Sequence, residues 1–257
     1  MKLTKSCAYL MVSDKSSHTA VLYFTLTPEA EAKQKNFASG SSLRSNKKIA
    51  QHLQNHTHRQ IQRTGLPFFV FNEHNQAGSS FGEKITRAFI DVFKQGYDNV
   101  IAVGNDTPEI KSDHLLQTSD LLESGRSSVV LGPAADGGTW LIGFNKNAFN
   151  SKSFQSLPWK SSDLFSAIIE EYHDEENITQ LECFGDIDRP EDLYLFLTSD
   201  LNGEKLLQLR RRISSLITPQ TTFTGENIVF QKLSGSFNSL LLRGPPNSSD
   251  YGHIFLD

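Results

Sequence analysis

Short apolar runs separated by helical stretches constrain this fold more than any other sequence feature. The runs are apolar along their whole length instead of alternating with polar residues, which is typical of parallel strands buried on both faces. They lie at residues 20–26, 68–71, 100–103, 129–131 and 140–144, and a further strand is expected at 178–184. The sequence therefore predicts an α/β fold with a mostly parallel, Rossmann-like sheet and helices on both faces.

Helices are expected between these runs because apolar residues there recur every three or four positions. Their expected ranges are 29–35, 43–63, 81–95, 114–123, 163–172, 188–197 and 203–217. Ser80 and Glu83 have capping-box spacing at the start of the third of these helices. Parallel sheets bind ligands beyond the carboxyl ends of their strands, and the acidic segments of this chain follow those ends.

The composition changes after Thr218, which divides the chain into residues 1–217 with the sheet and a small β-rich extension at residues 218–257. Two or three short strands are expected at residues 221–243. They could pair with a second chain in a homo-oligomer or cover an edge of the chain's own sheet. At the other end, residues 1–12 are interpreted as a frayed leader or a first strand.

Charge and cysteine content exclude several classes of protein. The 257 residues carry a formal net charge of -4, with a pI of about 6.1, which excludes a strongly basic nucleic-acid binder. No apolar stretch approaches the ~18 residues of a membrane span. Cys7 and Cys183 are far apart and fit no metal-binding spacing, which favours a reducing, cytoplasmic location.

Two acidic motifs directly follow predicted strands, and each has a structural as well as a chemical interpretation. Asp106 could hold a divalent cation that neutralises phosphates, or it could cap the next turn. Asp136 precedes Gly137 and Gly138, whose missing side chains let the backbone approach a ligand closely. An Asp-Gly pair between two apolar strands is also a strong hairpin signal, so both interpretations remain open.

A third acidic motif lies at residues 186–193. Asp188 and Glu191 have the Asp-x-x-Glu spacing of a helix N-cap, which accounts for Asp188 without any ligand. In an extended segment, Asp186 and Asp188 would share one face. Two carboxylates on one face also suit a metal ion, although the cap alone is sufficient to explain the pattern.

Together, and in this order, the three motifs resemble a bacterial family of GT-A-type, glycosyltransferase-like and nucleotidyltransferase-like proteins, the radical-SAM- or selenodomain-associated transferase type. The matching segments are Gly-Asn-Asp-Thr-Pro at 104–108, Leu-Gly-Pro and Asp-Gly-Gly within 131–138, Leu-Ile-Gly at 141–143, and Asp-Ile-Asp and Asp-Leu within 186–193. Gln-Ala-Gly-Ser-Ser-Phe-Gly-Glu-Lys at 76–84 and Pro-Trp at 158–159 also match. The resemblance covers about residues 18–200.

This family is similar in fold to sugar-nucleotide synthetases and, more distantly, to phospholactate guanylyltransferase. The resemblance implies a metal-dependent transferase that moves a glycosyl or nucleotidyl group, with Mg²⁺ or Mn²⁺ and a nucleotide or nucleotide-sugar. By position, Asp106 is implied as a metal ligand and catalytic residue, and Asp136 as a catalytic residue on the acceptor side. Asp186 and Asp188 are implied as metal ligands. The implied cofactor-binding residues are Lys33, Lys35, Glu83, Lys84, Gly137 and Gly138.

The segment after the first strand departs from the family pattern, in which a glycine-containing loop and a Lys-Thr-Arg sequence cradle phosphates. This chain keeps Pro28 but has no glycine there. Glu29 and Glu31 are expected where phosphates would lie, and like charge there is costly. Lys33 and Lys35 are candidate replacements for the basic residues. A catalytically degenerate homologue that acts as a binding or scaffold protein is therefore the second hypothesis.

Two further polar groups have weaker signals. His52 and His56 have the i, i+4 spacing of some zinc ligands, with His58 nearby, but no partner acid is evident and a solvated helix face is favoured. The three arginines at 210–212 end a predicted helix, where cations suit the helix dipole, and could contact an anionic partner.

Overall fold

A computed structural model describes residues 18–38, 41–173, 177–199 and 203–217 of the chain. All of them lie in the segment 1–217. The strands and the pairing expected for residues 218–257 lie outside the described residues, as do Cys7 and the leader or strand expected at residues 1–12. The division of the chain at residue 217 therefore stays a prediction.

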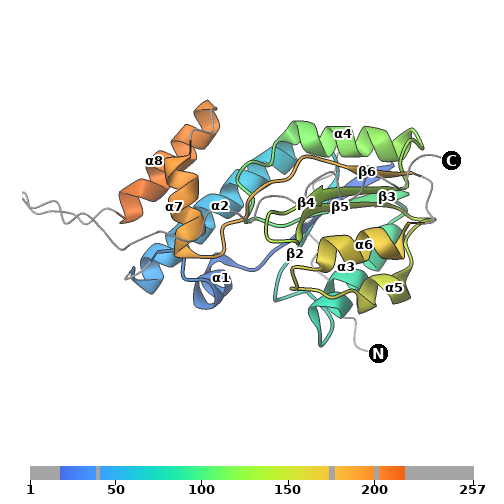
Figure 1. Cartoon of the computed structure of the whole chain (residues 1–257), viewed down its shortest axis with the longest axis horizontal. Helices are drawn as coiled ribbons and strands as arrows, with labels where there is room; N and C mark the ends of the chain where they lie inside the picture. The colour runs from blue at the N-terminus through green and yellow to red at the C-terminus, as the bar shows by residue number, and fades with distance from the viewer. Residues whose placement is uncertain (1–17, 39–40, 174–176, 200–202, 218–257) are drawn as a thin grey trace, which may run out of the picture. The chain divides into compact units, whose positions relative to one another are not determined.

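In the described part of the chain, six strands form one sheet in the order β2-β1-β3-β5-β4-β6 (Figure 1). The strands are β1 (Thr19–Phe24), β2 (Phe68–Phe71), β3 (Asn99–Val103), β4 (Val129–Pro133), β5 (Thr139–Asn145) and β6 (Ile178–Gln180). β1 is parallel to β2 and β3, and β4 is parallel to β6, whereas β5 runs antiparallel to β3 and β4. The predicted mostly parallel α/β sheet is confirmed.

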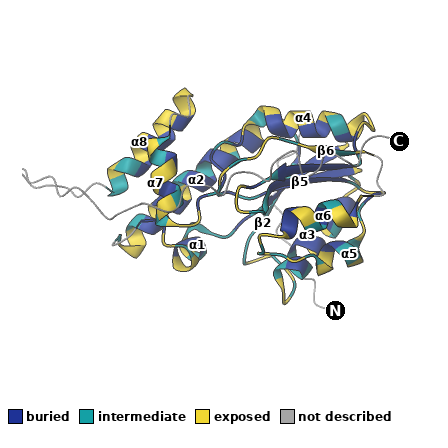
Figure 2. Ribbon diagram, in the orientation of Figure 1, coloured by how far each residue is buried: buried dark blue, intermediate teal, exposed yellow. Residues whose placement is uncertain are grey.

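Helices cover both faces of this sheet, as predicted. They are α1 (Pro28–Gln34), α2 (Leu43–Thr64), α3 (Phe81–Lys94), α4 (Ser112–Glu123), α5 (Ser151–Ser156), α6 (Leu164–Glu171), α7 (Pro190–Thr198) and α8 (Glu204–Ile217). Phe89 of α3, Phe154 of α5 and Ile168 of α6 pack on one face. Ile61 of α2 and Leu115 of α4 pack on the other, so the sheet between them is buried (Figures 1 and 2).

A third apolar cluster lies beside the sheet and joins α2, α7 and α8. Leu53 of α2, Leu193 of α7 and Leu209 of α8 are each at most 5% exposed within it. Burying side chains of this size contributes about 1.5–3 kcal/mol each. Ile187, which precedes α7, is also buried in this cluster. Its burial holds in place the segment that carries Asp186 and Asp188 on either side of it.

Helix ends follow the expected chemistry at α3 and differ from it at α7. Ser80 caps α3 by accepting the backbone N–H of Glu83, which confirms the N-cap half of the predicted capping box, whereas the Glu83 carboxylate accepts the backbone N–H of Ser79. The N-cap of α7 is Arg189 instead of Asp188. Asp192, one residue further along than Glu191, accepts the Arg189 backbone N–H at 2.9 Å, so Asp188 is not needed as a cap.

Several strand and helix boundaries also differ from the sequence prediction. β6 ends at Gln180 instead of residue 184, because the regular ladder stops where β4 has an irregular register at Gly132 and Pro133. Beyond it, Phe184 pairs with Ala134 only as an isolated bridge. The short helix α5 has no predicted counterpart.

β4 and β5 form a hairpin, which confirms the structural interpretation of the Asp-Gly pair. The Gly137 backbone N–H donates to the Ala134 carbonyl at 3.0 Å, and the Gly138 N–H donates to Asp136 Oδ1 at 2.8 Å. Gly137 has φ +90°, and a Cβ on it would lie 1.9 Å from the carbonyl oxygen of Ser162. Close packing against the segment before α6 therefore requires glycine at this position.

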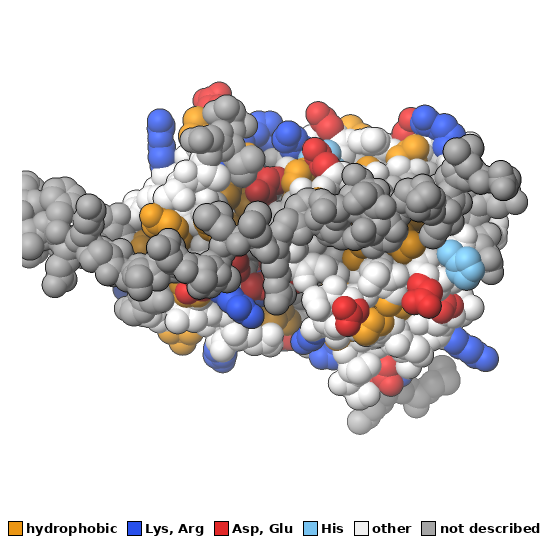
Figure 3. Space-filling model, in the orientation of Figure 1, with side chains coloured by type: hydrophobic (Ala, Val, Ile, Leu, Met, Phe, Trp, Pro, Cys, Tyr) orange, Lys and Arg blue, Asp and Glu red, His pale blue; other side chains and the backbone are white. Residues whose placement is uncertain are grey.

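None of the helices within the described ranges combines the length and apolarity of a membrane span. On the face drawn in Figure 3, acidic and basic side chains are interspersed over the described surface.

We expect Gly137→Ala to destabilise the fold, because a left-handed alanine costs about 1–2 kcal/mol and overpacking adds about 1–3 kcal/mol. Urea denaturation measures the loss. Gly125→Ala is the matched control, because Gly125 has φ +68° and a Cβ added to it would have nothing within 4 Å. It should lose only the conformational part, and equal losses in the two variants would contradict the packing argument.

Candidate active site

A cavity of about 640 Å³ lies at the carboxyl ends of β1 and β3. β1 lies between β2 and β3, so the chain adds strands first on one side of β1 and then on the other. Where the strand order reverses in this way, a crevice opens beyond the carboxyl ends of the strands. Thr25, Asn105 and Asp106 line the cavity after these two strands, and Asp136 lines it from the β4–β5 hairpin. Small-molecule sites have volumes of about 300–1,000 Å³, so this cavity is large enough for a nucleotide.

The ammonium group of Lys35 lies at the centre of the acidic part of this cavity. Its Nζ is 2.8 Å from Asp106 Oδ2 and 2.5 Å from Asp188 Oδ1. Glu31 Oε1 is 3.6 Å away, one helical turn earlier on α1. Burial alone would lower the pKa of Lys35, but the charges of Asp106, Asp188 and Glu31 raise it above its ordinary value. Lys35 is therefore a fixed cation between two predicted metal ligands.

Helix α1 brings Lys35 to this position. Thr27 caps the helix by accepting the Ala30 backbone N–H, and the Thr27 N–H donates to Glu73 Oε2 at 2.7 Å. Lys35 is the C-cap residue, and its own N–H donates to the Glu31 carbonyl. The segment that replaces the expected glycine-containing loop is thus a capped helix.

Glu31 forms the floor of the cavity and is only 2% exposed. Asn105 Nδ2 donates to both of its carboxylate oxygens, at 2.7 and 2.8 Å, and Gln54 Nε2 donates at 2.7 Å. Burial raises the pKa of Glu31, while Lys35, Asn105 and Gln54 act in the opposite direction. Glu29, in contrast, is exposed and pairs with Lys47 of α2. The expectation that two glutamates lie where phosphates would bind is therefore wrong for Glu29.

Burial and the excess negative charge of the site both raise the pKa of Asp186. Burial, together with the charges of Asp136, Asp106 and Asp188, raises the pKa of Asp186 to about 7. The carboxyl of Asp106 behaves differently: burial would raise its pKa, but the Lys35 charge and hydrogen bond hold it below its usual value. One lysine thus compensates part of the cluster, and Asp186 is left half-protonated near neutral pH.

The structure joins the first and third acidic motifs of the sequence in a common site. The backbone N–H of Ile187 donates to the Asp106 carbonyl at 2.8 Å, which ties the loop after β3 to the segment before α7. The carboxylates of Asp106 and Asp188 then meet at Lys35. Neither carboxylate is needed for the turn or cap that the sequence offered as its alternative.

Seven of the predicted site residues line the one cavity, and three do not. Those in the cavity are Lys35, Lys84, Asp106, Asp136, Gly138, Asp186 and Asp188. Lys33 is exposed on α1. Glu83 accepts the Ser79 backbone N–H and hydroxyl, at 2.7 and 2.8 Å. Gly137 packs against Ser162. The functional roles of all ten remain predictions.

Sequence reasoning expected Glu31 near the phosphates, but it missed Asn105, Lys160 and the contact between Glu31 and Asn105. Glu31 and Asn105 are joined only by the fold, and a sequence motif does not reveal a contact across 74 residues. Lys160 lines the cavity with φ +66°, a left-handed conformation that is uncommon outside glycine, and its Nζ lies 5.5 Å from the Phe81 ring centroid. Its only sequence signal is the preceding Pro-Trp pair.

The aspartates suit a divalent cation in donor chemistry, since Mg²⁺ and Mn²⁺ prefer carboxylate oxygens. Among the described residues, no group of three or more His, Cys, Asp or Glu side chains is arranged to hold a metal ion. Lys35 Nζ lies between Asp106 and Asp188, so a metal ion bound by both would take the place of the ammonium group. The residues fit such an ion provided that Lys35 moves away.

Comparison with protein families supports the resemblance seen in the sequence. Residues 43–161 match a family model described as an uncharacterized protein conserved in bacteria (DUF2064). No curated protein sequence matches the chain.

The chain is also similar to several solved structures. A "putative nucleotide-diphospho-sugar transferase" from Desulfovibrio desulfuricans G20 has a TM-score of 0.68 at 21% identity, over 78% of this chain and 97% of that chain. A cytidylyltransferase from Leptospira borgpetersenii has a TM-score of 0.40 at 13% identity, over 81% and 100%. Glucosyl-3-phosphoglycerate synthase from Mycobacterium tuberculosis, in complex with Mn²⁺ and UDP, has a TM-score of 0.39 at 13% identity, over 79% of this chain and 80% of that chain. Only the Desulfovibrio desulfuricans structure is similar enough to show the fold of this chain, and it confirms the predicted GT-A-like fold.

The raised pKa of Asp186 predicts a pH dependence of stability. An acid whose folded-state pKa exceeds its unfolded-state value makes the fold less stable as pH rises, here between about pH 4 and 7. In EDTA, Asp186→Asn should therefore match the wild type near pH 4 and exceed its free energy of unfolding by about 1–3 kcal/mol at pH 8. Asp91→Asn, which makes the same chemical change on the exposed side of α3, is the control. A constant difference for Asp186→Asn would contradict the cluster.

Removing the central cation should destabilise the loops around the cavity. Lys35→Met leaves Glu31, Asp106 and Asp188 without their shared partner, and we expect a loss of about 1–3 kcal/mol in the free energy of unfolding. Lys47→Met, which removes a surface ion pair with Glu29, is the control and should cause no measurable loss. Denaturant titration in EDTA compares the two variants, and an unchanged stability of Lys35→Met would show that the pairs carry no net energy.

Proposed function

We propose that the chain is a transferase for a nucleotide or nucleotide-sugar. It moves a glycosyl or a nucleotidyl group. The premise is that residues 43–161 match this bacterial family and that the sheet is GT-A-like. The observation that carries the proposal is the convergence of four aspartates and Lys35 in one cavity at the carboxyl ends of β1 and β3. Aspartates of this kind, placed where ligands of such sheets bind, are suited to a metal–diphosphate complex.

Asp106 and Asp188, with Asp186 beside them, are the side chains that would hold Mg²⁺ or Mn²⁺ in this proposal. A bound divalent cation neutralises diphosphate oxygens and stabilises charge on the leaving group. Lys84 and Lys160, which also line the cavity, supply positive charge for the phosphates. Asp136 on the hairpin lines the same cavity, and in this proposal it would bind or deprotonate an acceptor hydroxyl.

One observation favours a second candidate function. Lys35 already pairs with both proposed metal ligands, so the carboxylates have a cation without any metal. A binding protein that kept the fold and lost catalysis would retain this arrangement. Such a protein would bind a nucleotide without metal dependence or would bind none.

A thermal-shift panel of nucleoside triphosphates and of UDP-, GDP- and CDP-sugars, each with Mg²⁺, Mn²⁺ or EDTA, tests the proposal. A ligand at 100 times its dissociation constant adds about 2.7 kcal/mol to the free energy of unfolding. We expect one nucleotide class to stabilise the chain in a metal-dependent way, and turnover of that nucleotide would identify the transferred group. Stabilisation that is equal in EDTA would favour the second candidate.

Matched variants locate the binding. Asp106→Asn and Asp188→Asn should abolish the metal-dependent shift, whereas Asp91→Asn makes the same chemical change on the exposed side of α3 and should preserve it. A shift retained in both cavity variants would place the nucleotide elsewhere and overturn the proposed site.

A further inference from the structure

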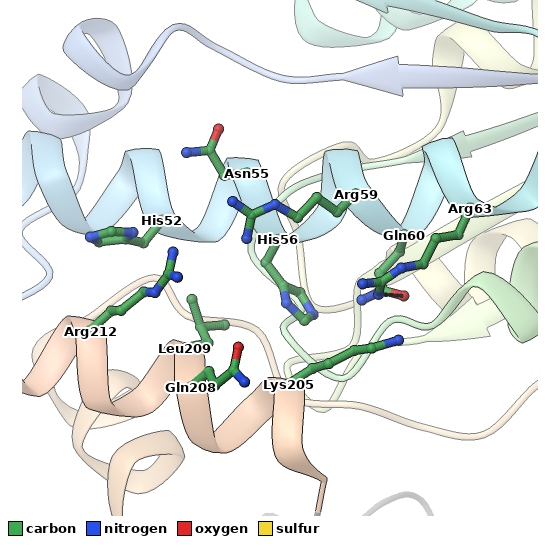
Figure 4. Close-up of a pocket in the computed structure, with 10 residues that line it drawn as sticks. All are labelled: His52, Asn55, His56, Arg59, Gln60, Arg63, Lys205, Gln208, Leu209 and Arg212. Atoms are coloured by element: carbon green, nitrogen blue, oxygen red, sulfur yellow. Dashed lines mark hydrogen bonds between the residues drawn. The ribbon is translucent and has the colours of Figure 1, made fainter.

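A second, smaller cavity lies between α2 and α8, away from the candidate active site. The two cavities share no lining residue. Figure 4 shows that side chains from one face of α2 and from the facing side of α8 point toward one another across it. The ionisable side chains that line this basic groove are His52, His56, Arg59, Arg63, Lys205 and Arg212.

The groove concentrates positive charge without compensation. Among the described residues, no Asp or Glu lines it and no ion pair involves Arg59, Arg63, Lys205 or Arg212. Arg63 has one hydrogen bond, from Nη1 to Gln60 Oε1 at 3.3 Å, which leaves its charge uncompensated. Like charges held close together repel, so this arrangement favours an anion between the helices.

The apolar packing of α2 against α8 holds these cations together. Leu53 of α2 and Leu209 and Ile213 of α8 are buried in a shared cluster, which fixes the separation of the two helices. The cations therefore cannot relieve their repulsion by moving the helices apart without exposing that cluster.

His56 provides an independent indication of a missing ligand. It is only 8% exposed, it lines the groove, and its Nε2 is buried with no hydrogen-bond partner among the described residues. Buried polar nitrogen atoms are almost always hydrogen-bonded, so each exception needs an explanation. Burial lowers the pKa of His56 and the charges of Arg63 and Arg59 act in the same direction, whereas backbone hydrogen bonds with Pro108 and Ile110 act in the opposite direction.

We propose that the basic groove between α2 and α8 binds a phosphate-class oxyanion. Arg59 and Arg63 on α2 and Lys205 and Arg212 on α8 neutralise its charge, and His56 donates from Nε2. The groove has a volume of about 70 Å³. A single water needs about 10–15 Å³ of such space, so the groove has room for an ion of phosphate size. This site is separate from the proposed transferase site and does not depend on it.

Calorimetric and thermal-shift titrations of the full chain with inorganic phosphate, against chloride at equal ionic strength, test the proposal. The wild type should show saturable stabilisation by phosphate alone. The double variant Arg59→Gln, Arg212→Gln should bind phosphate about tenfold or more weakly, since it lacks two of the charged donors. In chloride, this variant should melt no lower than the wild type, because neutralisation relieves repulsion.

Arg44→Gln is the control, because Arg44 is an exposed cation on α2 that lines neither cavity. Its phosphate affinity should stay within about twofold of the wild type, a change of about 0.4 kcal/mol. A parallel titration with glycerol 3-phosphate distinguishes a free phosphate ion from the phosphoryl end of a larger ligand, and the tighter binder identifies the source.

NMR of histidine-labelled protein locates the ion. Phosphate should shift the imidazole resonances of His56 and leave those of exposed His18 unchanged. Absence of saturable phosphate binding by the wild type would overturn the proposal. Binding that is unaffected in the double variant, or weakened equally by Arg44→Gln, would also overturn it.

Discussion

The ion pairs of Lys35 are the interaction on which the candidate site depends. A single ammonium group, at the end of α1, meets a carboxylate that follows β3 and another that precedes α7. These three segments are far apart in the sequence, and the carboxylates would repel one another without a cation between them. The excess charge that remains is visible at Asp186, which holds a proton up to about pH 7. A cluster of this kind stores electrostatic energy that a cationic or metal-bound ligand can release.

The surrounding structure keeps this cluster in place from two directions. Beneath it, Glu31 receives hydrogen bonds from Asn105 and Gln54, and Thr25 donates to Asn105 at 2.7 Å, so the buried polar atoms have partners. Beside it, Ile187 is buried in the cluster of α2, α7 and α8. Because Ile187 lies between Asp186 and Asp188 in sequence, its burial anchors the segment that carries both carboxylates. The hydrogen bonds of the buried polar groups and the apolar packing of Ile187 thus hold the carboxylates in the same arrangement.

Much of the fold follows from local patterns. The sheet was predictable because strands such as β3 are apolar on both faces, and the hairpin because Asp136 and Gly137 stand between two such strands. The start of α3 was predictable because Ser80 caps it through a contact three residues away. Each of these signals depends on neighbours in the sequence, which a single chain displays directly.

The site was only partly predictable because its contacts join distant segments. The sequence correctly placed aspartates beyond the carboxyl ends of the strands, but it could not show that Lys35 meets Asp106 across 71 residues. The expected cap at Asp188 was wrong because Asp192, one residue after the predicted partner, makes the bond instead. Side chains one position apart on a helix face different directions, and only the structure decides between them.

The position of Lys35 also determines how any cation can enter the site. Entry is an exchange and not a simple addition, because the ammonium must leave Asp106 and Asp188 before another cation can bridge them. The lysine stays attached to α1 while it is displaced, so it competes at a fixed effective concentration that dilution of the protein cannot reduce. It also remains within reach of whatever anion accompanies the entering cation. For a metal ion bound as proposed, the same side chain would be both its internal competitor and a tethered counter-charge for the anion that the ion carries.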